Sequence, residues 1–157
     1  MKKIAFLLFF ALTATLAHAQ FEKGTKFINT SLTGLNMQFN QDFKLGVEAK
    51  AGYFFADDWA VTAAAGLDYG NSTLNSLFGS AGVRYYIEQN GLFLGAGLKY
   101  VHQDSSYNDI LPGVELGYCF FLNKSVTIEP SLYYNISIKD SGNYSECGLK
   151  IGFSYYF

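Results

Sequence analysis

His102 begins the stretch of this sequence whose residue types could do chemistry. It is followed by Gln103 and the run Asp104–Ser106, so histidine, carboxylate and hydroxyl groups stand together as in a hydrolase triad. Consecutive residues of an extended strand point in alternating directions, and such neighbours seldom meet. We therefore favour a structural polar aromatic residue over a catalytic base, and we predict that the chain is not an enzyme.

The groups that could bind a metal or a nucleotide are sparse. Cys119 and Cys147 are the two cysteines, and His102 is the one histidine beyond residue 19, whereas a zinc site needs three or four such ligands. The Gly-rich stretch GLFLGAGLKY (91–100) contains no G-x-G-x-x-G and precedes no helical pattern. We therefore expect no metal and no cofactor. The cysteines fall near opposite ends of non-adjacent predicted strands, which predicts two free thiols.

The N-terminus has the composition of a secretory signal peptide. Two lysines precede an apolar run over residues 4–10, and a small-residue stretch ends as Ala-His-Ala at 17–19, an A-x-A-like cleavage site. We predict a cleaved signal peptide over 1–19, export from the cytoplasm, and a single mature domain over 20–157.

The composition of the mature chain excludes some partners. Without the two leader lysines the chain has nine basic and thirteen acidic residues, so we expect no nucleic acid partner. No apolar run beyond the leader approaches the ~18 residues of a membrane helix. A membrane, if this chain meets one, must be crossed by strands.

Apolar residues alternate with small or polar ones over most of the mature chain. This period of two predicts strands, and no segment has a convincing helical period. The expected strands cover about residues 25–36, 43–55, 59–69, 77–87, 92–102, 110–121, 126–138 and 146–157. They predict an all-β fold, a single eight-stranded antiparallel up-and-down transmembrane β-barrel.

Repeated aromatic clusters support this count of strands. AGYFF (51–55), VRYYI (83–87), GYCFF (117–121) and FSYYF (153–157) end 32, 34 and 36 residues apart, about the length of a hairpin of two long strands with its loops. Connections after the clusters are short, and those at the other ends are longer and rich in Asn, Ser, Asp and Gly. Short turns on one side and longer loops on the other are typical of outer-membrane barrels.

The distribution of charge indicates which face points inward. The apolar face carries no ionised side chain, whereas the other face holds five basic and five acidic groups among Gly, Ala, Ser and Thr. We predict apolar residues toward lipid and ion pairs inside a narrow lumen. At Pro130 we expect a bulge or a shortened ladder, because proline has no N–H. The predicted lumen network is Lys44, Glu48, Lys50, Asp68, Arg84, Lys99, Glu115, Glu129, Glu146 and Lys150.

The sequence ends with apolar residues at every second position: Leu149, Ile151, Phe153, Tyr155 and Phe157. This ending resembles the C-terminal signal of bacterial outer-membrane barrels, and the whole mature chain resembles the small eight-stranded barrels of the OmpX type and the membrane domain of OmpA. The resemblance implies a Gram-negative outer membrane, pairing of the last strand with the first, periplasmic termini, and reading of the signal by the barrel-assembly machinery. The aromatic residues expected at the lipid interface are Tyr53, Phe55, Trp59, Tyr85, Tyr118 and Phe120.

These observations favour a structural or surface-interaction protein with an ion-paired, closed lumen. Its expected partners are outer-membrane lipid, the assembly machinery, and a surface ligand held by outer loops such as 103–109 and 139–145. The first alternative is a narrow channel for water or very small solutes. Less favoured are a lipid-modifying enzyme around His102, which we place at the lipid interface, and a soluble ligand-binding barrel with its faces inverted.

Overall fold

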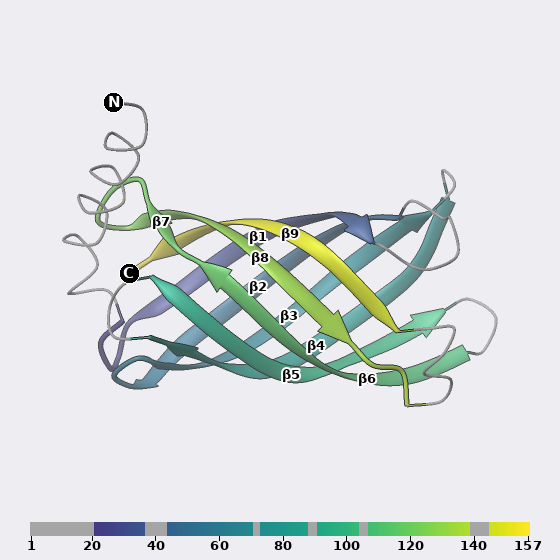
Figure 1. Cartoon of the computed structure of the whole chain (residues 1–157), viewed down its shortest axis with the longest axis horizontal. Coiled ribbons are helices and arrows are strands. Elements are labelled where there is room, and N and C mark those ends of the chain that lie inside the picture. Colours follow the sequence, from purple (N-terminus) through teal and green to yellow (C-terminus); the bar gives the residue numbers. More distant parts are fainter. Residues whose placement is uncertain (1–20, 37–43, 71–72, 88–90, 104–106, 139–144) are drawn as a thin grey trace, which may run out of the picture.

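The chain folds into one closed antiparallel sheet (Figure 1). The structure is a computed structural model that describes residues 21–36, 44–70, 73–87, 91–103, 107–138 and 145–157. Its strands are β1 (Lys26–Asn36), β2 (Lys44–Ala56), β3 (Trp59–Gly70), β4 (Thr73–Tyr86), β5 (Leu92–Gln103), β6 (Tyr107–Tyr118), β7 (Phe120–Phe121), β8 (Val126–Asn135) and β9 (Glu146–Tyr156). Because β6 and β7 are consecutive parts of one strand, the described wall has eight strands, which confirms the predicted fold.

The barrel closes between β1 and β9, as the resemblance implied. Phe157 N donates to Lys26 O at 2.9 Å, and Lys26 N donates to Phe157 O at 3.0 Å. The end of the barrel that contains these residues and the short turn at Asp57 and Asp58 is called the turn end here. The opposite end is the loop end. The predicted signal peptide lies outside the described residues, and no helix within the described ranges is long and apolar enough to cross a membrane.

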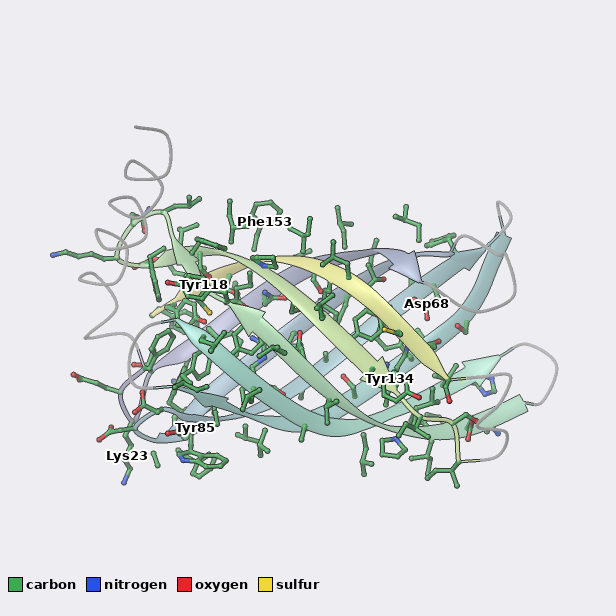
Figure 2. The ribbon with its side chains drawn as sticks, in the orientation of Figure 1. Lys23, Asp68, Tyr85, Tyr118, Tyr134 and Phe153 are labelled. Carbon is green, nitrogen blue, oxygen red and sulfur yellow. The ribbon has the colours of Figure 1, made fainter. Side chains whose placement is uncertain are left out.

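The two faces of the wall follow the alternation of the sequence. On β9 the outward side chains of Ile151, Phe153 and Tyr155 are 43%, 53% and 48% exposed, while Ser154 and Tyr156 are buried. Figure 2 shows side chains such as Phe153 projecting from the outside of the wall. The exterior is therefore the apolar face, which is the reverse of a soluble barrel.

The ladder between β6 and β8 is interrupted at Pro130. Five consecutive pairs ending at Gly117–Ser131 join β6 to β8, and β7 resumes the pairing at Phe120–Ile128 in the same register. The gap falls opposite Pro130, whose ring nitrogen carries no hydrogen to donate. This is a shortened ladder without a bulge, and it separates β6 from β7.

A second proline limits the same seam near the loop end. Ile136 N donates to Pro112 O at 2.8 Å, but Pro112 has no N–H to return the bond. The pairing of β8 therefore ends at Asn135, three residues before the predicted boundary at residue 138.

Two glycines allow β4 and β5 to approach closely. A Cβ on Gly82 would lie 2.5 Å from the carbonyl oxygen of Ala96, and a Cβ on Gly97 would lie 2.6 Å from that of Ala81. These carbonyl oxygens belong to the backbone and cannot move aside for an added Cβ, as the end of a flexible side chain could. Glycine is therefore required where these strands bend past each other.

Gly82→Ala is expected to destabilise the barrel by about 1–3 kcal/mol, the usual cost of overpacking a fitted site. Gly79→Ala is the matched control on the same strand, because its new Cβ would meet its nearest neighbour at an ordinary 3.9 Å. Urea unfolding followed by the fluorescence of Trp59 measures both. Equal urea midpoints of unfolding for the two variants would show that the close approach of β4 and β5 does not restrict the size of the side chain at residue 82.

Candidate functional site

The interior of the barrel is built around Arg84, which β4 projects into the lumen. Its Nη1 lies 2.9 Å from Glu129 Oε2, and its Nη2 lies 3.1 Å from Glu115 Oε2. The guanidinium carbon lies 4.2 Å from the centroid of the Phe93 ring, a cation–π contact. Arg84 and Glu129 are only 3% and 2% exposed, so their charges depend on each other rather than on water.

Glu115 connects Arg84 to a second set of charges. Lys50 Nζ lies 3.4 Å from Glu115 Oε2 and 3.3 Å from Glu48 Oε1. Lys150 Nζ lies 3.1 Å from Glu48 Oε1. Opposite charges thus follow one another without a break from Glu129 to Lys150, and none of these groups is left as an isolated buried ion.

A separate cluster lies nearer the loop end. Lys99 Nζ bridges Glu146 at 3.0 Å and Asp68 at 3.4 Å, and it sits 4.2 Å from the centroid of the Phe78 ring. Figure 2 marks Asp68 at this end of the barrel. The lumen therefore holds two ion clusters at different heights.

Of the ten predicted lumen charges, the nine with described side chains all form ion pairs; the side chain of Lys44 lies outside the described part. The order of the strands alone predicts that Asp68 lies near Glu48 and Lys50 on the adjacent strand, and the observed partners differ. Asp68 instead pairs with Lys99. The Arg84–Glu129 pair joins β4 to β8, which are not neighbours in the sheet. Pairs form across the lumen because its width is within reach of two long side chains.

The turn end of the lumen is filled by aromatic rings that the sequence reasoning missed. All of them are 6% exposed or less, and their rings contact one another, as in the stacked Phe27–Tyr156 pair with centroids 5.2 Å apart. Adjacent aromatic residues on a strand must point to opposite faces, so each repeated cluster carried the missed signal. This aromatic floor consists of Phe21, Phe27, Phe54, Tyr86, Phe93, Phe121 and Tyr156.

The predicted interface aromatics lie outside the wall near the turn end. Tyr53, Phe55 and Trp59 are 42–46% exposed. The other three are half-buried by their neighbours: Tyr85 packs on Trp59 with ring centroids 4.8 Å apart, and the Tyr118 and Phe120 centroids are 4.6 Å apart. Among the predicted signal residues, Ile151, Phe153, Tyr155 and Phe157 are exposed, and Leu149 is half-buried.

The residues considered for chemistry do not assemble into a described site. His102 is exposed, and its Nδ1 lies 2.6 Å from Asn108 Oδ1; residues 104–106 lie outside the described ranges. Within those ranges no group of His, Cys, Asp and Glu could hold a metal ion. Cys119 is buried and Cys147 is exposed, and both are free as predicted.

A cavity of about 90 Å³ lies among the lumen charges. Its lining includes Arg84 and Glu115, Lys99 and Asp68, and glycines such as Gly97. A water molecule needs roughly 10–15 Å³ by this measure, so several waters can fit among polar partners. The cavity exists because small residues of β4, β5 and β6 face the lumen at this height.

Closure of the sheet, an apolar exterior and an ion-paired interior together define a small transmembrane β-barrel. No protein-family model and no curated protein sequence matches the chain. The N-terminal β-barrel domain of Pseudomonas aeruginosa OprF is similar at TM-score 0.69 and 14% identity, over 86% of this chain and 98% of that one. Neisserial surface protein A (NspA) is similar at a TM-score of 0.60 and 16% identity, over 85% of this chain and 96% of that one.

The outer-membrane protein Ail of Yersinia pestis is also similar, with a TM-score of 0.52 and 17% identity over 86% of this chain and 100% of that one. At these identities the likeness shows the fold. The chain has the fold of the small eight-stranded outer-membrane barrels.

Arg84→Met is expected to destabilise the folded barrel by about 3–5 kcal/mol, because it leaves Glu129 buried without its cation. Lys124→Met removes an exposed charge from the turn before β8 and is expected to change stability by no more than about 0.5 kcal/mol. Urea unfolding in detergent or vesicles measures the difference. If Arg84→Met and Lys124→Met had the same urea midpoint of unfolding, the buried network would contribute nothing to stability.

Proposed function

We propose that this protein resides in a bacterial outer membrane, spans the lipid as a barrel with a closed lumen, and has a structural or surface-interaction role. The observation that carries the proposal is the combination of large exposed apolar side chains outside and paired charges inside. An apolar surface that surrounds the whole wall needs an apolar solvent.

The spacing of aromatic residues along β3 supports insertion in lipid. Trp59 and Tyr69 are ten residues apart on this strand and are 42% and 43% exposed. At ~3.3 Å per residue and a tilt of 35–45°, ten residues span about 25 Å of membrane, the height of the apolar band in such barrels. Tyr134 marks the loop end and Tyr85 the turn end (Figure 2).

The lumen contents support a closed barrel. A solute would have to pass the layer formed by Arg84, Glu115 and Glu129 and then the aromatic floor. Separating such buried pairs costs several kcal/mol per ion. A lumen without an open passage suits a protein whose work is done by its surface and its loops.

The surface-interaction part of the proposal rests on the longer loops. One crystal structure of Ail from Yersinia pestis is a complex with the heparin analogue sucrose octasulfate. In the present chain the loop sequences around 103–109 and 139–145 contain Asp104, Asp109 and Asp140 against Lys139. This mildly acidic composition favours a neutral or basic surface ligand over a polyanion.

Expression with the full leader in a Gram-negative host is expected to give a chain that starts at Gln20, sediments with the outer membrane, and migrates differently on cold and boiled SDS gels. Small residues at 17 and 19 suit cleavage, and a closed barrel resists cold SDS. A variant with Ala19→Lys is the control for cleavage and is expected to keep its leader. A soluble protein that folds without detergent and shows no gel shift would contradict the proposal.

The second candidate function is a narrow channel, favoured by the 90 Å³ cavity among the lumen charges. The closed lumen predicts that purified protein adds neither ion conductance to a planar bilayer nor water permeability to vesicles, relative to the protein-free membrane. Raised water permeability without ion conductance would favour the channel. Discrete ion-conducting steps would contradict a closed lumen.

A further inference from the structure

The segment before β1 crosses the mouth of the lumen at the turn end. Phe21 is 3% exposed, and its ring stacks on Tyr86 with centroids 4.3 Å apart and an interplanar angle of 24°. The Phe21 ring also lies 5.6 Å from Phe121 and meets Tyr156 edge-on at 6.0 Å. A residue that belongs to no strand therefore occupies the centre of the aromatic floor.

Hydrogen bonds fix this segment to the end of β2 and to the turn between β2 and β3. Asp58 N donates to Phe21 O at 2.8 Å, and Gly24 N donates to Phe54 O at 2.8 Å. Lys23 N donates to the Asp57 side chain at 2.9 Å. Asp58 has a φ of 63°, a left-handed conformation that Asp tolerates in turns. The turn is thus shaped to hold the segment over the mouth.

The mode of attachment distinguishes Phe21 from the rest of the floor. Phe54, Tyr86 and Tyr156 lie on wall strands, so moving them would break the ladders of the barrel. Phe21 precedes β1. Its withdrawal with Glu22 and Lys23 would break the bonds to Asp57 and Asp58 of the β2–β3 turn and one local bond. The bonds of Gly24 and Thr25 to Phe54 on β2 could stay in place. Phe21 is the one ring of the described floor that can leave while the wall stays intact.

A thiol that can report access from water belongs to the same buried cluster as this ring. Cys119 is 1% exposed, and its Sγ lies 3.7 Å from Tyr156 Oη. Tyr156 Oη in turn donates to Glu129 Oε1 at 2.9 Å, and Glu129 is the partner of Arg84. Opening the mouth would therefore expose first the thiol and then the ion network.

We propose that residues 21–23 act as a built-in stopper, with Phe21 as the part that seals the turn end of the lumen. The stopper can be displaced independently of the barrel wall, and it shields Cys119 and the Glu129–Arg84 pair from water. This inference does not depend on which compartment the turn end faces or on what the loops bind.

The test uses Cys119 as the reporter of the seal. In full-length protein carrying Cys147→Ser, Cys119 is the one remaining thiol, and its rate of reaction with a charged methanethiosulfonate is measured in membranes. Phe21→Ala is expected to raise this rate at least tenfold. Phe55→Ala removes the same side chain from the outer wall beside the same turn, where it is 46% exposed, and is expected to stay within twofold of the parent.

Each variant is also run on a cold SDS gel, which reports whether its barrel is folded and closed. Asp57→Ala keeps every ring and removes the acceptor of Lys23 N, so it tests the stopper if Phe21→Ala does not fold; a rate between those of the parent and the unfolded chain is expected. The inference is overturned if the parent reacts as fast as unfolded protein, or if the folded variants of Phe21 and Asp57 remain as protected as the parent.

Discussion

Charged side chains inside a narrow barrel must be paired, and this requirement orders the rest of the structure. Arg84 and Glu129 would each cost several kcal/mol if buried alone. Because side chains alternate along a strand, a strand that sends these groups inward sends apolar residues outward. A slip of one residue would bring the charges to the lipid-facing surface, so the pairs also specify the register of the strands. The apolar exterior and the need for lipid follow from the same alternation.

The period of two made the strands and their faces predictable from sequence, since it depends only on residues within one strand. The partners of Asp68 and Arg84 were not predictable in this way, because pairs across the lumen depend on the stagger of the closed barrel and on side-chain rotamers. The floor was missed because the inward face was described by its charged and small residues alone. The aromatic residues between the outward ones, such as Phe54 and Tyr156, were assigned to no face. Phe21 precedes the first periodic segment, so no pattern could place it.

The fold is shared with OprF, NspA and Ail at identities of 14–17%, so the fold by itself does not specify a function. The function of this chain must therefore be inferred from its own lumen and surface. The Arg84 layer and the aromatic floor occupy the lumen toward the turn end, while glycines such as Gly97 line a cavity nearer the middle. The ladder of pairs between β6 and β8 is shortened beside Pro112 and Pro130.

The most direct test of the account is the position of Trp59, the one tryptophan of the chain, in a lipid bilayer. Protein inserted in vesicles is mixed with lipids that carry bromine either near the headgroup or near the end of the acyl chain, and fluorescence quenching is measured. An inside-out barrel predicts strong quenching of Trp59 by the shallow bromine and weaker quenching by the deep one, because the residue faces lipid at the interface. Absence of quenching by either lipid would mean that the apolar face is not the lipid-facing face.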